Sequence, residues 1–146
     1  MAGGYKPVEH AADLGLKAWG RNPKELLEEA ANGMVAQMYD PALVQEKEKR
    51  EISLEAESIE ELLLQWLKEI LIRTEQEGIL FCRFQIEKDN FSIRNAKTAQ
   101  IQASLYGEKA DPARHDICIE IKAVTRHGLY VKKNGPWWEA NILFDT

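Results

Sequence analysis

Long apolar runs, cysteine and a surplus of basic residues are missing or scarce in this sequence of 146 residues. No stretch comes near the roughly 20 apolar residues of a membrane-spanning helix, and residues 1–5 are too few and too polar for the apolar core of a secretory signal. The two cysteines, Cys82 and Cys118, are not spaced like metal ligands and stand among apolar neighbours, which is typical of small buried side chains in a reducing compartment. These absences predict a cytoplasmic protein that makes no contact with a membrane.

Acidic residues outnumber basic ones by 24 to 19, which gives a formal net charge of −5. A protein that grips bare nucleic acid by neutralising its phosphates needs the opposite balance, so this class of protein is disfavoured. A local basic strip stays open as an alternative. Its candidate residues are Arg94, Lys97, Arg114, Lys132 and Lys133.

The sequence also lacks the short motifs of several common catalytic sites. It has no P-loop, no GxGxxG after a strand, no GxSxG elbow and no HExxH metal motif. Spacing alone therefore identifies no nucleophile paired with a base.

Two segments have the apolar period of amphipathic helices. The first begins after the N-cap candidate Asn22 and ends before Asp40. The second follows a capping box formed by Ser58 and Glu61, and it ends at Gly78.

Most of the remaining chain alternates apolar and polar residues, with the period of two that is typical of half-buried strands. Hairpin turns are predicted at Asp89–Asn90, leading into a strand with Phe91 and Ile93, and at Asn134–Gly135. The other predicted strands cover residues 13–19, 45–57, 79–88, 100–105, 117–123, 129–131 and 138–145. This order predicts an α+β fold in which two helices pack on a mostly antiparallel twisted sheet or sandwich, in a single domain over residues 1–146.

Five polar residues stand near predicted strand ends and are the candidate functional side chains: His10, Asp13, Lys122, His127 and Asp145. Residues three apart in one extended strand point to opposite faces, so His10 and Asp13 can serve one site only if a turn lies between them.

The last predicted strand continues almost to Thr146, which would hold Asp145 close to the α-carboxylate of Thr146. Two adjacent anions repel each other, and a hard cation relieves the repulsion. If the loop that carries Asp13 lies over the end of this strand, three carboxylates converge on a site suited to Ca²⁺, Mg²⁺ or Mn²⁺. A solvated terminus with two isolated charges is the alternative.

Three segments resemble the archease family: HAADLG at residues 10–15, EIKAVTRHGL at residues 120–129 and ILFDT at residues 142–146. The resemblance extends over essentially the whole chain, including the helix with Trp66 and the loop with Gly107, Glu108, Asp111 and His115. One departure is Ala11, where the family usually has Thr.

The resemblance implies a non-enzymatic accessory factor of the RtcB-type RNA ligase, which joins tRNA exons and other cleaved RNAs with GTP and a divalent metal. Such a factor promotes formation of the ligase–guanylate intermediate and ligase turnover, so tRNA is a partner only indirectly.

The resemblance also implies a divalent metal at one tip of the molecule, Ca²⁺ being favoured over Mg²⁺ and Mn²⁺. The matching ligand positions are Asp13, Asp145 and Thr146. Lys122 matches a lysine regarded as functionally important in the family. Two further residues match family positions without an assigned ligand role: His10 and His127.

Two other functions compete with this one. A metal-dependent hydrolase would use Asp13 and Asp145, with His10 or His127 as general base. A module that binds RNA directly, or that acts as a chaperone of a tRNA methyltransferase, is the second rival, and RNA binding would depend on the basic strip.

Overall fold

The computed structural model describes residues 2–10, 13–91 and 99–146, with the backbone alone for residues 9, 10 and 13. The described residues form seven strands, two α-helices and one short 3-10 helix. The strands are β1 (Gly4–His10), β2 (Asp13–Gly20), β3 (Glu48–Ala56), β4 (Ile79–Asn90), β5 (Ala99–Lys109), β6 (Ala123–Asn134) and β7 (Trp137–Asp145). The helices are α1 (Pro23–Met38), α2 (Ile59–Glu77) and the 3-10 helix η1 (Pro41–Leu43). Within this described part, no helix has both the length and the apolar character that crossing a bilayer requires.

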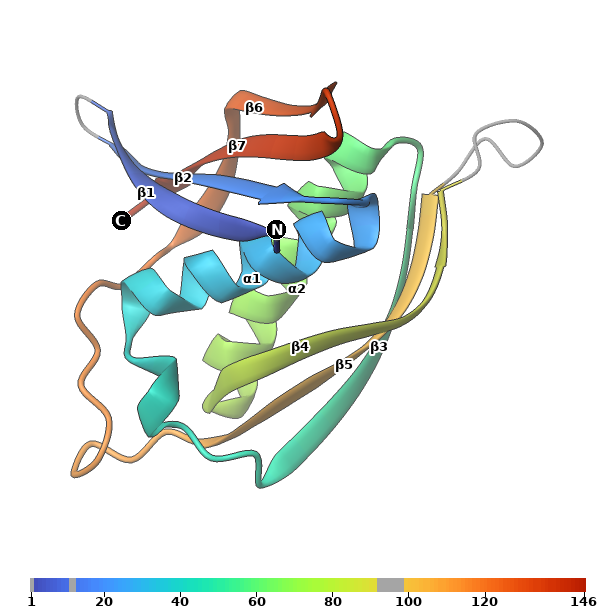
Figure 1. The fold of residues 1–146 in the computed structure, drawn as a ribbon. Helices are drawn as coiled ribbons and strands as arrows, with labels where there is room; N and C mark the ends of the chain where they lie inside the picture. Colours follow the sequence, from blue (N-terminus) through green and yellow to red (C-terminus); the bar gives the residue numbers. More distant parts are fainter. Residues whose placement is uncertain (1, 11–12, 92–98) are drawn as a thin grey trace.

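Two open sheets enclose the α-helices. The strand order is β1-β2-β7-β6 in the four-stranded sheet and β3-β5-β4 in the three-stranded sheet, and the described pairings are antiparallel. Both α1 and α2 lie between the sheets and contact strands of each (Figure 1). The predicted α+β fold, with two helices packed on antiparallel sheets, is therefore confirmed.

The helix ends are set by the residues that the sequence indicates. The Asn22 side-chain oxygen accepts a hydrogen bond from the Glu25 amide at 2.8 Å, and the Ser58 hydroxyl accepts one from the Glu61 amide at 3.1 Å. Gly78 ends α2 with a φ of 67°, a left-handed conformation that glycine adopts without a steric cost.

The core lies between the two sheets. The inward residues Leu16 of β2 and Ile142 and Phe144 of β7 are fully buried, as the alternation in these strands predicts. Trp66, at the centre of α2, is also fully buried, and its indole N–H donates to the carbonyl of Leu27 in α1 at 2.8 Å. Burying each such apolar side chain contributes about 1.5–3 kcal/mol to folding, so this layer holds the two sheets at a fixed separation.

Strand β1 was not predicted, because its residues do not alternate between apolar and polar. It is an edge strand that pairs with β2, with Gly4 opposite Trp19. A Cβ atom at Gly4 would come within 2.7 Å of the Trp19 indole, so the absence of a side chain lets this ring lie across β1.

The turn predicted at Asp89–Asn90 is wrong. Both residues belong to β4 and pair with Ile101 and Gln100 of β5. The predicted strand with Phe91 and Ile93 is not formed at Phe91, and Ile93 lies outside the described residues. A polar pair indicates a turn only when the strands around it stop pairing, and here pairing continues to Asn90.

The strand predicted over residues 117–123 is also wrong, because β6 begins only at Ala123. Ile117 and Ile119 are 51% and 37% exposed, and only Ile121 among the three isoleucines is buried. Neither cysteine is fully buried, since Cys82 is half-buried and Cys118 is exposed. Residues 117–122 have a strand-like apolar period, but no strand among the described residues pairs with them.

Candidate functional site

The ends of β1, β2 and β7 lie side by side. They form one edge of the four-stranded sheet, the edge that runs across the strand ends. His10 and Asp13 form the last register pair of β1 and β2. Leu14 pairs with Phe144 of β7, and one residue beyond this pair β2 begins at Asp13 and β7 ends at Asp145. The backbone therefore places the start of β2 beside the end of β7, whereas the turn predicted before Asp13 falls on residues 11–12, which lie outside the described part of the chain. The side chains of His10 and Asp13 lie outside the described residues.

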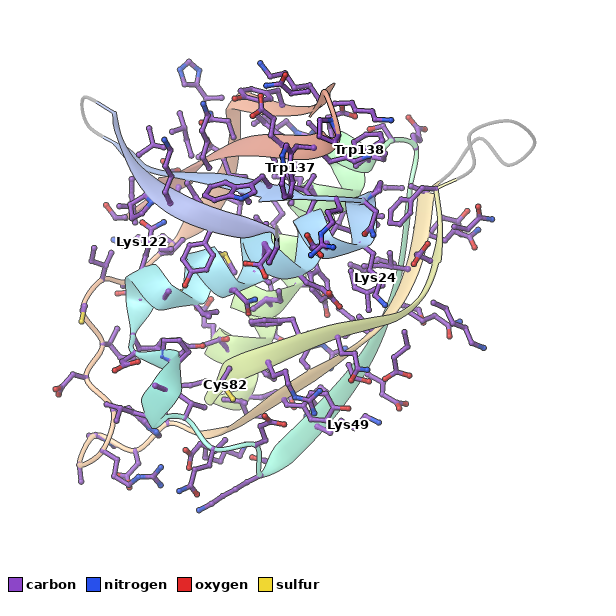
Figure 2. The ribbon with its side chains drawn as sticks, viewed as in Figure 1. Lys24, Lys49, Cys82, Lys122, Trp137 and Trp138 are labelled. Carbon is purple, nitrogen blue, oxygen red and sulfur yellow. The ribbon has the colours of Figure 1, made fainter. Side chains whose placement is uncertain are left out.

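Strand β6 brings Lys122 to the same edge. Ala123 pairs with Asp145, and the amide of Lys122 donates to the carbonyl of Asp145 at 2.8 Å. Lys122, Asp145 and Thr146 are all exposed. Figure 2 shows Lys122 on the side of the molecule where Figure 1 marks the C-terminus. We call this edge, formed by Asp13, Lys122, Asp145 and Thr146, the strand-end site.

His127 lies in a bulge of β6. The pairing of β6 with β7 shifts register between Thr125 and Tyr130, which leaves the four residues 126–129 opposite one residue of β7, Ile142. The bulge is held by a hydrogen bond of 3.0 Å from the Asn141 side-chain amide to the carbonyl of Gly128. His127 is exposed on this bulge, at a position that the register with β7 does not fix.

The donor chemistry of the strand-end site fits a hard divalent cation. Two aspartates stand at adjacent strand ends, and a carboxylate such as that of exposed Asp145 is an oxygen ligand that Ca²⁺ and Mg²⁺ prefer. Among the side chains that the structure describes, no three histidine, cysteine, aspartate or glutamate residues are grouped to hold a metal, and the side chain of Asp13 is outside that set. The metal ligation by Asp13, Asp145 and Thr146 therefore stays a prediction.

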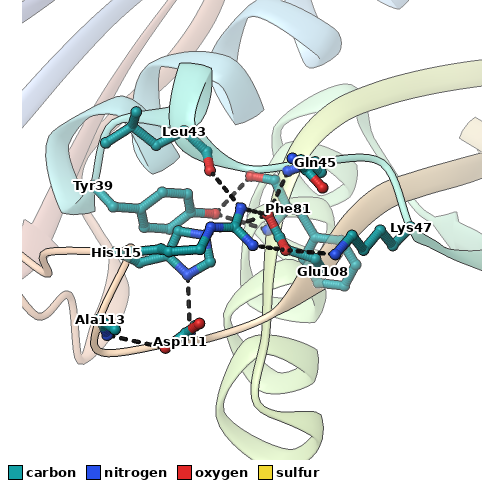
Figure 3. Close-up of polar contacts among 10 residues, drawn as sticks. Tyr39, Leu43, Gln45, Lys47, Phe81, Glu108, Asp111, Ala113 and His115 are labelled. Carbon is teal, nitrogen blue, oxygen red and sulfur yellow. Dashed lines mark hydrogen bonds and ion pairs between the residues drawn. The ribbon is translucent and has the colours of Figure 1, made fainter.

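A buried carboxylate, Glu108 near the end of β5, is the centre of a polar cluster (Figure 3). Glu108 is only 4% exposed. Its carboxylate accepts hydrogen bonds from the amide of Gln45 at 2.6 Å and from the Arg114 guanidinium at 2.8 and 3.1 Å. These two partners, the Gln45 amide first, hold the pKa of Glu108 well below its usual range, at about 2.

His115 completes the cluster, and its contacts indicate which ring nitrogen carries the proton. The amide of Asp111 donates to His115 Nδ1 at 2.9 Å, so this nitrogen is an acceptor and the proton of the neutral ring is on Nε2. That Nε2 faces Glu108 at 3.3 Å. A neutral histidine thus gives the buried carboxylate a further donor without adding a charge.

The cluster fixes the irregular segment 110–122, which leads to Lys122. The amide of Ala110 donates to the carbonyl of Gly78, and the amide of Cys118 donates to the carbonyl of Met38, both at 2.8 Å. Together with the Glu108 contacts, these bonds hold the segment against the ends of α1 and α2. Sequence reasoning gave Glu108 and His115 no role. The only signal was an acid near the end of a predicted strand, followed within a few residues by an arginine and a histidine.

Replacing Glu108 with Gln should remove a contribution to the free energy of unfolding that varies with pH in the acid range. A carboxyl whose pKa is lowered on folding, here from 4.5 to about 2, stabilises the fold above the unfolded value. That contribution is lost as the pH falls from 4.5 towards 2. Urea unfolding of wild type should therefore show stability declining across this window, whereas Glu108→Gln should be less stable at neutral pH and should show a flatter decline.

Glu51→Gln is the matched control, because the Glu51 side chain is 74% exposed and, among the described residues, forms an ion pair only with exposed Lys49. It should unfold like wild type throughout the same range of pH. A Glu108→Gln variant with the acid dependence of wild type would show that this carboxylate is not the group responsible.

The predicted basic strip is not assembled by the described residues. Arg114 is engaged with Glu108 in the segment after β5, whereas Lys132 pairs with Glu139 of β7 at 3.3 Å. Lys133 is exposed on β6, and the other two candidates, Arg94 and Lys97, lie outside the described residues.

Comparison with known proteins identifies relatives along nearly the full chain. The model of the Archease protein family (MTH1598/TM1083) matches residues 5–146. The protein archease of Methanopyrus kandleri is 33% identical over 141 residues, covering 97% of this chain and 98% of that protein.

Two solved structures share the fold. The solution structure of Methanobacterium thermoautotrophicum protein 1598 aligns with a TM-score of 0.81 and 25% identity, covering 98% of this chain and 99% of that one. The crystal structure of a Thermotoga maritima protein, described as an archease and possible chaperone, aligns with a TM-score of 0.59 and 23% identity over 97% and 96% of the two chains. Because the family model matches residues 5–146 and relatives align over nearly the whole length, the chain belongs to the archease family.

Proposed function

We propose that this protein is a non-enzymatic accessory factor that activates an RtcB-type, GTP-dependent RNA ligase. It promotes guanylylation of the ligase and sustains its turnover, in tRNA splicing or RNA repair. The strand-end site is the part of the molecule that meets the ligase, and at this site tRNA is served only through the ligase.

The observation that carries the proposal is the convergence of aspartates at the edge of one sheet. Asp13 and Asp145 are each one residue beyond the Leu14–Phe144 pair, and Lys122 is joined to Asp145 through the backbone. The exposure of Asp145 and Lys122 supports a contact with another molecule. Family membership supports the ligase as that molecule, because it is the partner that the resemblance implies.

In this proposal Asp13, Asp145 and Thr146 would hold a divalent metal through oxygen atoms, with Ca²⁺ favoured over Mg²⁺ and Mn²⁺. The metal would supply positive charge for negatively charged groups of the partner. Three protein ligands do not complete the six to eight oxygens that Ca²⁺ takes, which leaves coordination positions for water or partner groups.

The chain's own residues position this site. The pairing of β2 with β7 holds the two aspartates at adjacent strand ends, and the Glu108 cluster holds the segment that leads to Lys122. The ammonium group of exposed Lys122 is then available to a phosphate or carboxylate of the partner. A chaperone role, named for the Thermotoga maritima relative, is compatible with this proposal if the ligase is the protein assisted.

The test is a guanylylation assay of the cognate ligase with GTP and a divalent metal, with and without this protein. Wild type should increase the yield of ligase–guanylate and the number of ligation turnovers, and Asp13→Ala should give no increase. The isolated protein should hydrolyse no phosphoester. A ligase that responds equally to Asp13→Ala and wild type would disprove the role of the strand-end site. Phosphoester hydrolysis that is lost with Asp13→Ala would favour the hydrolase instead.

A further inference from the structure

The outer face of the four-stranded sheet, the face turned away from α1 and α2, carries an unusual group of side chains. Residues that pair directly in an antiparallel sheet share a face, and neighbours along a strand alternate. Because Leu16 and Ala140 are buried against the helices, Lys17 and Glu139 face outward.

The register then assigns the remaining members of this face. Lys6 of β1 pairs with Lys17, Trp19 pairs with Glu139, and Lys132 of β6 also pairs with Glu139. Figure 1 shows the helices on only one side of this sheet, and Figure 2 shows Trp137 on the same sheet at the start of β7.

A hollow of about 410 Å³ opens on this face. Its lining combines two indoles with two ammonium groups, one amide and one carboxylate: Trp19, Trp137, Lys6, Lys17, Asn134 and Glu139. Both tryptophans are half-buried, so each leaves part of its ring accessible from the hollow.

The charge of the hollow is opposite in sign to that of the whole chain. The Glu139 carboxylate is paired with Lys132 at 3.3 Å, and Lys132 also lies 4.9 Å from the ring centre of Tyr130. Within the described part of the chain, no carboxylate forms an ion pair with Lys6 or Lys17. Two ammonium groups that no described carboxylate neutralises therefore flank the indoles, although the protein carries a net charge of −5.

We propose that this hollow and the face around it bind single-stranded RNA. Bases stack on Trp19 and Trp137, and Lys6 and Lys17 contact the phosphates between them. An open antiparallel sheet with accessible aromatic rings is a platform on which unpaired bases stack, and lysines along it follow the backbone. The choice of RNA over DNA rests on the proposed function, whereas the stacking and the phosphate contacts do not.

A protein partner fits this face less well. Lysine is depleted from the cores of protein–protein interfaces, yet here two lysines without an ion pair to any described carboxylate line the hollow together with the indoles. Duplex RNA is also disfavoured, because its bases are stacked on each other and cannot lie on the tryptophans.

The test measures fluorescence anisotropy of a labelled single-stranded RNA of about ten nucleotides, a length within the range of such sites, titrated with the full chain. We expect saturable binding at low salt and quenching of tryptophan fluorescence. The slope of log K against log salt should be about −1.4, because each of two lysines contributes about −0.7 with single strands.

Lys6→Glu combined with Lys17→Glu should weaken binding at least tenfold. Lys88→Glu, an exposed charge reversal on the three-stranded sheet, should leave it unchanged. Trp137→Leu should weaken binding by roughly tenfold through lost stacking. The melting temperature of each variant shows whether it is folded. If Trp137→Leu does not fold, the double lysine variant still tests the proposal.

Four outcomes would overturn the proposal. They are absence of RNA binding by wild type, binding that the two lysine substitutions do not weaken, equal binding of duplex RNA, and single-stranded DNA of the same sequence bound as tightly as RNA. Loss of ligase stimulation in the double lysine variant, without RNA binding by wild type, would assign the face to a protein contact instead.

Asp145 lies at the opposite end of β7 from the hollow, so Asp145→Ala should bind RNA like wild type. Failure of the ligase proposal and failure of the RNA proposal can therefore be distinguished.

Discussion

Asp145→Ala is expected to abolish stimulation of ligase guanylylation while leaving the fold intact. Asp145 is the last residue of β7 and is exposed, whereas its neighbour Phe144 is fully buried. The substitution removes a carboxylate from the surface and no apolar contact from the core. The carbonyl of Asp145, which accepts the hydrogen bond from Lys122, belongs to the backbone and is retained.

The physical reason for so large an effect is the small number of ligands. A divalent cation held by only three protein residues loses a large share of its ligation when one carboxylate is removed. Asp145→Asn should fail almost as completely, because the amide keeps the shape of the side chain but loses the negative charge. Calcium titration by calorimetry should show weaker binding for both variants.

Asp116→Ala is the matched control. Asp116 is exposed in the segment before Lys122, and this change also removes one surface carboxylate. It should stimulate the ligase like wild type. If Asp145→Ala stimulated the ligase as well as Asp116→Ala does, the strand-end site could not be the part of the protein that acts on the ligase.

The helices were the elements that the sequence predicted best, because their signals are local. Ser58 and Glu61 define the start of α2, Gly78 defines its end, and the stripe of apolar residues between them fixes the buried face. Each of these signals acts within a few residues, so it does not depend on how distant parts of the chain pack.

The strands were predicted less well, because a strand exists only where another strand pairs with it. The apolar period of a strand is present at Ile117, Ile119 and Ile121. The segment is instead held by the Glu108 cluster and by the hydrogen bond from the Cys118 amide to the carbonyl of Met38. Conversely, β1 has no apolar period and forms because β2 pairs with it along its whole length, with Gly4 leaving room for the Trp19 ring. Both outcomes depend on residues far away in the sequence.

The candidate site was predictable in outline for a different reason. The last strand had a clear alternation, so the position of Asp145 at its end followed from the sequence. The position of Asp13 beside it depended on the order of strands in the sheet, which the spacing of residues does not contain. The outward lysines and tryptophans were not anticipated either, since Lys6, Lys17 and Trp137 meet only through that same strand order.

Trp66→Ala is expected to have the largest effect on stability. Trp66 is fully buried, and its ring contacts Phe84 of β4 edge-on at a centroid distance of 6.1 Å. Its indole N–H donates a hydrogen bond to the carbonyl of Leu27 in α1. Truncation leaves a cavity between α2, α1 and the three-stranded sheet. Removing a buried aromatic side chain in this way costs about 3–5 kcal/mol, a large part of the roughly 5–15 kcal/mol that stabilises a typical domain.

Urea unfolding followed by circular dichroism should show this loss, with Trp66→Phe between wild type and Trp66→Ala. The phenylalanine ring fills most of the cavity, but the Leu27 carbonyl loses the indole donor and keeps only its hydrogen bond within α1, at a cost of about 0.5–1.5 kcal/mol. Ile72→Ala is the control on the same helix, because Ile72 is 44% exposed and its truncation should change stability by only about 0.5 kcal/mol. Equal losses at positions 66 and 72 would mean that the indole does not join the helices to the sheet. A loss confined to position 66 would show that this side chain holds α1, α2 and the three-stranded sheet together.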